Sequence, residues 1–217
     1  MASGTIKTIL FDLGRVLISF DHSIASTRIS AFTGSDQADI YNLFFDSDLT
    51  ADFEEGKISP EDFFLKVKER LGVKIGYDDF LPIWNEIFFV TKDNSRVYSL
   101  VKSLKGRYNL SMLTNINCLH FDYIKKHYDI FPAFDRIFTS FGLKAKKPNP
   151  LIYKKVMDLL GNEPQEIFYT DDRHELVEVA RSLGIKAFLF KDYLQLKKDL
   201  LQEGVELQPE SSLLVSQ

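Results

Sequence analysis

The chain has 217 residues, 45% of them hydrophobic, and its 19 phenylalanines exclude a disordered chain and supply a large core. The formal net charge of −4 indicates no basic face for nucleic acid, and the single cysteine, Cys118, excludes an intramolecular disulfide. No apolar run is long enough to span a bilayer, so we expect a cytoplasmic protein that binds neither nucleic acid nor a membrane.

The chain begins with TIKTILFDL, a short apolar run rich in β-branched residues, which predicts a buried strand ending near Asp12. The next segment, residues 19–92, shows helical periodicity throughout and predicts four helices without strands. One helix has a strong start signal, because Ser59 precedes Pro60 and two acidic residues. We therefore expect a helical lid inserted after the first strand.

The rest of the chain alternates strands with helices. The predicted strands are Tyr108–Asn115, Asp135–Ser140, Glu166–Asp172 and Ile185–Phe190. The predicted helices are Ser95–Lys105, Asn117–His127, Asn149–Leu160, His174–Leu183 and Asp192–Gln202. Such alternation predicts right-handed crossovers and a parallel sheet.

The predicted fold class is α/β, with a Rossmann-like, doubly wound parallel sheet core and an inserted helical-bundle cap. We expect the core in residues 1–18 and 93–205, the cap in residues 19–92 and a tail in residues 206–217. A set of aromatic residues at helical spacing is interpreted as the core of the cap in preference to a substrate platform: Phe44, Phe45, Phe63, Phe64, Phe88 and Phe89.

Polar side chains follow the predicted strands at the points where they end. They are Asp12, Thr114, Asn115, Asp171 and Asp172, and the loop residue Lys147 precedes a helix nearby. Ligands bind beyond the carboxyl ends of the strands in an open parallel sheet, so we expect these side chains to share one crevice. Taken singly, the strand-end residues could also cap a turn or a helix, and Lys147 could be an ordinary solvated loop lysine.

Together these residue types suit phosphate chemistry. Asp12, Asp171 and Asp172 supply the hard oxygen ligands that Mg²⁺ prefers. Lys147 can neutralise a phosphoryl group, and the Thr114 hydroxyl with nearby N–H groups can hold its oxygens. With metal bound, Asp12 can attack phosphorus as a nucleophile.

Four motifs in this order, FDLGRVL, LTNINCLH, KKPNPLIY and IFYTDD, resemble those of the haloacid dehalogenase-like hydrolase superfamily. The resemblance covers about Ile6 to Phe190, and the helical insertion is similar to the superfamily's C1 cap. It implies that Asp12 is the nucleophile and that Thr114 and Lys147 act beside it. It also implies a metal site at Asp12, Asp171, Asp172 and the main-chain carbonyl of Gly14.

The form LTNINCLH resembles a branch that includes phosphatases of sugar phosphates such as glucose 1-phosphate. Asn115, Asn117 and His120 match that branch, and together with Arg15 they are the candidate substrate-binding residues. Arg15 departs from the pattern of the branch, because a small or amide residue is usual there. Leu176 departs as well, at a position where the superfamily often has asparagine.

Gly14 occupies the position where most phosphatases of the superfamily carry a second aspartate, a general acid worth about 10²–10⁴-fold in rate. Three cases follow. In the first, the substrate's leaving group needs no acid, as in a glycosyl or acyl phosphate. In the second, a nearby side chain replaces the acid, with Asp21, His22, Arg15 and His120 as candidates. In the third case the protein binds a ligand without turning it over.

The sequence therefore predicts a Mg²⁺-dependent phosphohydrolase of a small, sugar-phosphate-like metabolite, acting through an aspartyl-phosphate on Asp12. A ligand-binding or regulatory protein is the first alternative, and a metal-independent haloacid dehalogenase is the less favoured one. The sequence leaves the oligomeric state open. Cys118 is interpreted as a small hydrophobe, since no neighbouring base activates it.

Overall fold

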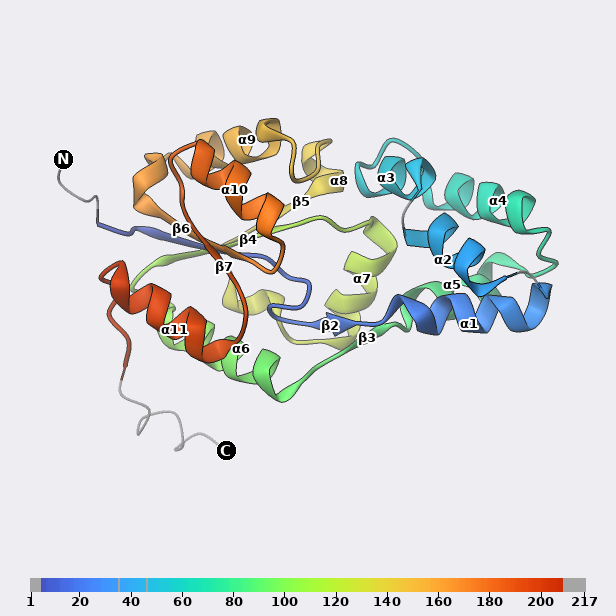
Figure 1. The fold of residues 1–217 in the computed structure, drawn as a ribbon, viewed down its shortest axis with the longest axis horizontal. Helices are drawn as coiled ribbons and strands as arrows, with labels where there is room; N and C mark the ends of the chain where they lie inside the picture. Colours follow the sequence, from blue (N-terminus) through green and yellow to red (C-terminus); the bar gives the residue numbers. More distant parts are fainter. Residues whose placement is uncertain (1–4, 35, 46, 209–217) are drawn as a thin grey trace.

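The fold is described from a computed structural model, for residues 5–34, 36–45 and 47–208 (Figure 1). Five parallel strands form the central sheet in the order β5-β4-β1-β6-β7. They are β1 (Thr8–Phe11), β4 (Asn109–Thr114), β5 (Arg136–Thr139), β6 (Ile167–Asp171) and β7 (Lys186–Leu189). The first strand is central, paired with β4 on one side and β6 on the other. The prediction of an α/β fold with a parallel sheet is confirmed.

Helices cover both faces of the sheet, because successive side chains of a strand point to opposite faces. Helices α6 (Lys92–Leu104), α7 (Cys118–His127) and α11 (Tyr193–Gln202) pack on the face that carries Ile9 and Phe11. Helices α9 (Pro150–Leu160) and α10 (His174–Ser182) pack on the opposite face, against Leu10. Figure 1 shows these two layers above and below the sheet. The remaining short pieces are η1 (Phe131–Ala133), α8 (Ser140–Leu143) and η2 (Pro164–Glu166).

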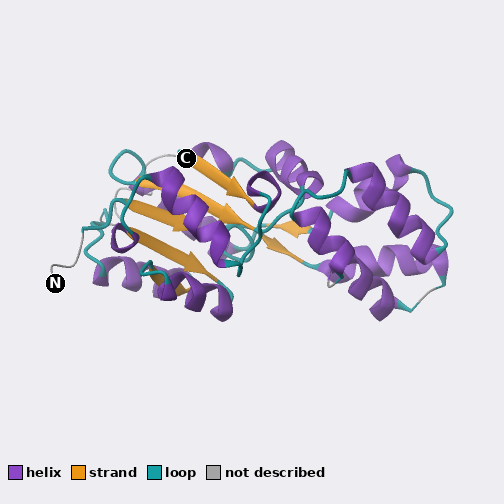
Figure 2. Cartoon of the chain, turned by 90° about the horizontal axis from the view of Figure 1, so that it is seen from above, coloured by secondary structure: helices purple, strands orange, loops and turns teal. Residues whose placement is uncertain are grey.

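The inserted segment forms a separate helical layer beyond the carboxyl edge of the sheet (Figure 2). Its described residues contain five helices: α1 (His22–Thr33), α2 (Gln37–Phe45), α3 (Asp48–Glu54), α4 (Pro60–Leu71) and α5 (Tyr77–Asn85). They share a hydrophobic cluster built around Phe44, Phe63 and Trp84. That cluster supports the predicted division into core and cap, whose boundaries stay a prediction.

Two details of the cap differ from the expectation of four helices without strands. The fifth helix, α3, has 7 residues, too few to show a clear helical period, and the Ser47 side chain caps it by accepting from Thr50 N–H at 3.3 Å. A two-stranded antiparallel ribbon, β2 (Ser19–Phe20) with β3 (Phe88–Phe89), joins the cap to the core. Strands of two residues leave no alternation in the sequence.

The predicted tail, residues 206–217, falls largely outside the described residues. At its start Glu206 N–H donates to the Tyr108 hydroxyl at 2.9 Å. Throughout the described part of the chain, every helix is too short or too polar to cross a bilayer.

Candidate active site

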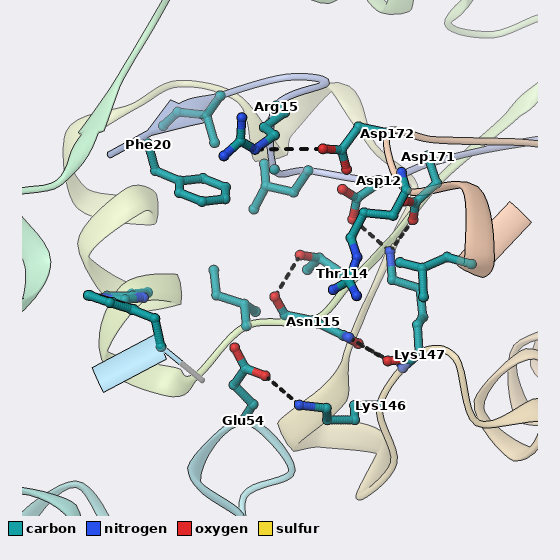
Figure 3. Close-up of a pocket in the computed structure, with 18 of the residues that line it drawn as sticks. Asp12, Arg15, Phe20, Glu54, Thr114, Asn115, Lys146, Lys147, Asp171 and Asp172 are labelled. Carbon is teal, nitrogen blue, oxygen red and sulfur yellow. Dashed lines mark hydrogen bonds and ion pairs between the residues drawn. The ribbon is translucent and has the colours of Figure 1, made fainter. Parts of the chain in front are cut away.

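A cavity of about 350 Å³, a size suited to a small ligand, lies where the carboxyl edge of the sheet meets the cap (Figure 3). The core lines it with the loop residue Lys147 and with the residues that the sequence placed at strand ends: Asp12, Thr114, Asn115, Asp171 and Asp172. The cap and the ribbon line it with Phe20, His22, Phe45, Glu54 and Phe88. The structure therefore brings the predicted strand-end residues together in one place.

Lys147 lies at the centre of a buried network of charged and polar groups, with 1% of its side chain exposed. Its Nζ lies 2.7 Å from Asp12 Oδ1 and 2.6 Å from Asp171 Oδ2. The same nitrogen donates to the Leu113 carbonyl at 3.0 Å and to the Tyr169 hydroxyl at 3.1 Å, and that hydroxyl donates to Asp171. One buried cation thus holds carboxylates from two neighbouring strands.

Burial shifts the protonation of this network in opposite directions for acids and base. Burial raises the pKa of the Asp12 carboxyl to about 7, against the opposing charge of Lys147. Burial also raises the pKa of Asp172, and the charge of Asp171 adds to the rise. For Lys147, burial acts to lower the pKa, but Asp12 and Asp171 together hold it above the usual value. Lys147 is therefore charged at neutral pH.

Three carboxylates form the donor set of a possible cation site. Asp12, Asp171 and Asp172 each offer an oxygen, and these oxygens lie within 4.8 Å of one another. They come from β1 and β6, which pair side by side and end at the same edge of the sheet. Carboxylate oxygens are ligands that Mg²⁺ prefers, so the donor set fits this ion.

The turn after β1 carries Gly14 and Arg15 to the cavity. Arg15 has a φ of 58°, a left-handed conformation that non-glycine residues seldom adopt. The buried side chain of Asn94, at the start of α6, donates to the carbonyls of Arg15 and Val16 at 3.2 and 3.0 Å. Held in this way, the turn places Arg15 Nε 3.7 Å from Asp172 Oδ2 (Figure 3).

A family model described as haloacid dehalogenase-like hydrolase matches residues 9–190. The chain belongs to this family. The match agrees with the span from Ile6 to Phe190 that the four motifs predicted, and it covers both segments of the sheet and the helical insertion.

Relatives of this hydrolase include two phosphatases. The sesquiterpene phosphatase astK of Aspergillus oryzae is 28% identical over 201 residues, which are 91% of this chain and 96% of the relative. The D-ribitol-5-phosphate phosphatase of Bacteroides thetaiotaomicron is 21% identical over 189 residues, 84% of this chain and 91% of the relative. A crystal structure of a family enzyme from that bacterium, in complex with magnesium and inorganic phosphate, matches with a TM-score of 0.76 at 28% identity. That match covers 88% of this chain and 98% of the other.

In this hydrolase Thr114 and Asn115 end β4 at the cavity, as predicted. Thr114 is buried, with 3% of its surface exposed. Asn115 forms a reciprocal pair with the main chain of Lys147: its Oδ1 accepts from the N–H at 2.8 Å and its Nδ2 donates to the carbonyl at 2.8 Å. The geometry makes Asn115 a clamp on the loop that carries Lys147, and its contact with substrate stays a prediction.

Asn117 and His120 form hydrogen bonds at the start of α7, and their polar atoms are not directed to a ligand in the cavity. Asn117 Oδ1 accepts from His120 N–H at 2.9 Å, and its Nδ2 lies 3.0 Å from His120 Nδ1. His120 Nε2 lies 3.0 Å from the Trp84 carbonyl of the cap, which assigns the proton to Nε2. His120 lines the cavity with both nitrogens engaged, whereas Asn117 lies outside the lining. Substrate binding by these two residues stays a prediction that the geometry does not favour.

Of the six aromatic residues predicted as cap core, Phe89 lies on β3 with 44% of its surface exposed, so that prediction is wrong for Phe89, and the other five divide in two. Phe44, Phe63 and Phe64 are buried inside the cap. Phe45 and Phe88 pack against the same cluster and also line the cavity. A helical period shows which side of a helix is apolar, but it does not show which part of that side meets a cavity.

Sequence reasoning missed Phe20 of the ribbon and three polar groups at this site. Tyr169 lies two residues before Asp171 on β6, and the two-residue period of a strand would have placed it on the same face. Glu54 pairs with Lys146 at 3.2 Å and joins the cap to the core. Asn94 supports the Arg15 turn from 79 positions away. The last two contacts leave no local signal in the sequence.

Proposed function

We propose that this hydrolase is a Mg²⁺-dependent phosphatase of a small phosphorylated organic molecule, with Asp12 as its nucleophile. One observation carries the proposal: Asp12, Asp171 and Asp172 offer oxygens within 4.8 Å of one another beside the buried Lys147. The phosphatase relatives and the family enzyme complexed with magnesium and phosphate support it.

Asp12, Asp171 and Asp172 would hold Mg²⁺, with the Gly14 carbonyl as the further predicted ligand. When bound, the ion neutralises charge on the phosphoryl oxygens and on the carboxylates. Lys147 fixes Asp12 through its Oδ1, so that the carboxylate is oriented before substrate arrives.

In the first step an Asp12 oxygen forms a bond to phosphorus, and the bond from phosphorus to the leaving oxygen breaks with its electron pair. The Thr114 hydroxyl and nearby N–H groups hold the transferring group. Water then hydrolyses the aspartyl-phosphate, which releases phosphate and restores the carboxylate.

No side chain among the four predicted substitutes suits the role of the missing acid. Burial lowers the pKa of His22 to about 4 and that of His120 to about 3, so both are neutral at pH 7. Asp21 caps α1 by accepting from Ser23 N–H at 2.9 Å, and hydrogen bonds from Ser23 lower its pKa. The Arg15 guanidinium is engaged by Asp172 at 3.7 Å and by the Phe20 ring. We infer that the leaving oxygen departs without a proton from these side chains.

Phosphate release from a series of substituted phenyl phosphates tests two claims: that Asp12 is the nucleophile, and that no side chain protonates the leaving oxygen. We expect release that requires Mg²⁺, falls by about 10⁴-fold or more in Asp12→Asn, and depends steeply on the pKa of the leaving phenol. Mass spectrometry of the quenched protein should detect phosphate on Asp12. Release that persists in Asp12→Asn contradicts the nucleophile, and a flat dependence on the phenol pKa contradicts the missing acid.

The alternatives make different predictions in the same experiment. A ligand-binding protein releases no phosphate from any ester, with or without Mg²⁺. A haloacid dehalogenase releases halide from a haloalkanoate without metal, and the clustered carboxylates of Asp12, Asp171 and Asp172 argue against it.

A further inference from the structure

Six aromatic rings form a closed circuit on the cap side of the cavity. Taken in order around the circuit, they are Phe20, His22, Phe45, Trp84, His120 and Phe88. Neighbouring ring centroids lie between 3.7 and 6.2 Å apart. All but Trp84 line the cavity, and this set is called the ring wall below. Figure 3 shows Phe20 of this wall across the pocket from Lys147.

The ring wall offers a substrate apolar surface and little hydrogen bonding. Its two histidines are neutral at pH 7, because burial lowers the pKa of both. Both nitrogens of His120 are engaged by Asn117 and the Trp84 carbonyl. The His22 ring stacks flat on Phe45, with an interplanar angle of 3°. Hydroxyl groups of a sugar would lose water here and could find partners only at the His22 nitrogens.

Further apolar side chains extend this surface, and the charged groups at its edges are already paired. Ile18, Ile116 and Ile124 line the cavity as well. At one edge Arg15 lies over the Phe20 ring at 5.1 Å and faces Asp172. At the other edge Glu54 and Lys146 pair with each other.

Gly14 lets the ring wall approach the nucleophile. A Cβ added at Gly14 would lie 3.0 Å from Phe20 Cε1 and 3.8 Å from Asp12 Oδ2. The first distance is too short for an ordinary contact, so a side chain at position 14 would displace the ring. The Phe20 ring therefore packs directly against Gly14, two residues along the chain from Asp12.

We propose that the substrate is the phosphate ester of an apolar alcohol or phenol, whose hydrocarbon part packs on the ring wall. This proposal rests on the proposed function, because it needs the phosphate to bind beside Asp12. It replaces the sugar-phosphate-like substrate that the sequence suggested, and it makes Phe20, Phe45 and Phe88 specificity residues.

Binding of two phosphonates to the wild-type chain with Mg²⁺ tests the ring wall without turnover. Calorimetry should show n-hexylphosphonate binding at least about 100-fold more tightly than methylphosphonate, since each buried methylene is worth about fourfold in a binding constant. Equal affinities, or no binding of either compound, would overturn the proposal.

Turnover of two phosphates with the same type of leaving oxygen gives the second measurement. n-Hexyl phosphate and sorbitol 6-phosphate are both esters of a primary alcohol on a six-carbon chain, so they differ chiefly in polarity. We expect kcat/KM to favour the hexyl ester by at least about 100-fold. A ratio near one, or a preference for the sorbitol ester, would count against an apolar substrate.

Variants at two half-buried phenylalanines assign the preference to the wall. Phe45→Gln should lower the ratio of the two kcat/KM values by about tenfold, because it places an amide on the wall. Phe188→Gln is the matched control, since Phe188 stacks on Phe168 at 4.7 Å and does not line the cavity. The ratio is taken on one folded sample and does not depend on yield. An unchanged ratio in Phe45→Gln would show that the ring wall does not determine substrate specificity.

The outcomes separate this proposal from the proposed function. Asp12-dependent phosphate release that favours the sorbitol ester would refute the apolar substrate and leave the phosphatase intact. Tight binding of hexylphosphonate without release from any ester would refute the phosphatase and leave the apolar ligand.

Discussion

The two halves of the cavity are lined by different kinds of side chain: charged groups on one side and neutral rings on the other. The core half places three carboxylates at the ends of strands and Lys147 on a loop beside them, and the side chains of Asp171 and Lys147 are at most 1% exposed. The cap half, with the ribbon and His120 of α7, places neutral rings around the same space, and three isoleucines of the core extend that apolar surface. One half is suited to holding charge and the other to excluding water from an organic group.

This difference indicates that the core half carries out catalysis and that the cap half selects the substrate. Charges in the core half are fixed by the main chain of a sheet, which gives them accurate positions. The cap half is fixed by side chains that stack on one another across several helices. Its surface can therefore be altered by substitutions at single residues. Substitutions in the core half should therefore alter kcat and stability most, and substitutions in the cap half should alter substrate preference.

Lys147→Met is expected to have the largest effect. It leaves the buried carboxylates of Asp12 and Asp171 facing each other without their cation. We expect the free energy of unfolding in EDTA to fall by about 3–5 kcal/mol, and kcat by about 10²–10³-fold. Urea unfolding and phosphate release measure the two losses, and Mg²⁺ should restore part of the stability.

Lys146→Met is the matched control for this variant. Its side chain is 32% exposed and pairs with Glu54 in the cap, so its loss should cost less than about 1 kcal/mol. Equal losses in the two variants would show that the buried network has no special role.

Gly14→Asp tests whether the cap half excludes a general acid. Alone, it should destabilise the protein by about 1–3 kcal/mol, because its Cβ would lie 3.0 Å from the Phe20 ring. With Phe20→Leu to make room, the new carboxyl should raise kcat on alkyl phosphates by up to about 10²-fold. It should also flatten the dependence on leaving-group pKa. A double variant as steep as the wild type would contradict this explanation.

His120→Leu tests whether His120 joins core to cap without reacting. The change leaves the Trp84 carbonyl unpaired and should cost about 1–3 kcal/mol at pH 8, with kcat changed by less than about threefold. The folded-state pKa of about 3 lies below the unfolded value near 6.5, so the wild type loses stability as the pH falls through that window. The difference between variant and wild type should therefore shrink at about pH 5.

His127→Leu, at an exposed site on the same helix, is the control for this prediction and should leave stability within about 0.5 kcal/mol of wild type. A large fall in kcat for His120→Leu with unchanged stability would instead point to contact with substrate.

The pH dependence of Mg²⁺ binding is expected to be the smallest of the effects predicted here. The folded pKa of Asp12, about 7, lies above its ordinary value of 3.8, so the metal-free protein should lose stability as the pH rises from about 4 to about 7. Mg²⁺ competes with that proton, so the Kd for Mg²⁺ should rise by up to about tenfold for each unit by which the pH is lowered below 7. Melting temperatures with and without Mg²⁺ at about pH 5 and about pH 8 measure this. In Asp12→Asn the dependence should flatten, and a Kd that is equal at both pH values would contradict it.

The core half was predictable because its signals are local. Asp12 and Asp171 each follow an apolar run that can only be a buried strand, and parallel strands end at one edge. Even Tyr169 follows from the two-residue period of β6. The boundaries of the five strands moved by at most three residues from the prediction, since strand ends depend on pairing more than on composition.

By itself, therefore, the sequence determined the alternating sheet, the helical insertion and the line of acidic and basic residues at the sheet edge. Only the tertiary structure decided what faces them. Phe20 and His120 belong to one circuit of rings although they lie 100 positions apart in the chain. Contacts of that kind depend on how the cap packs against the core, and no local period in the sequence encodes that packing.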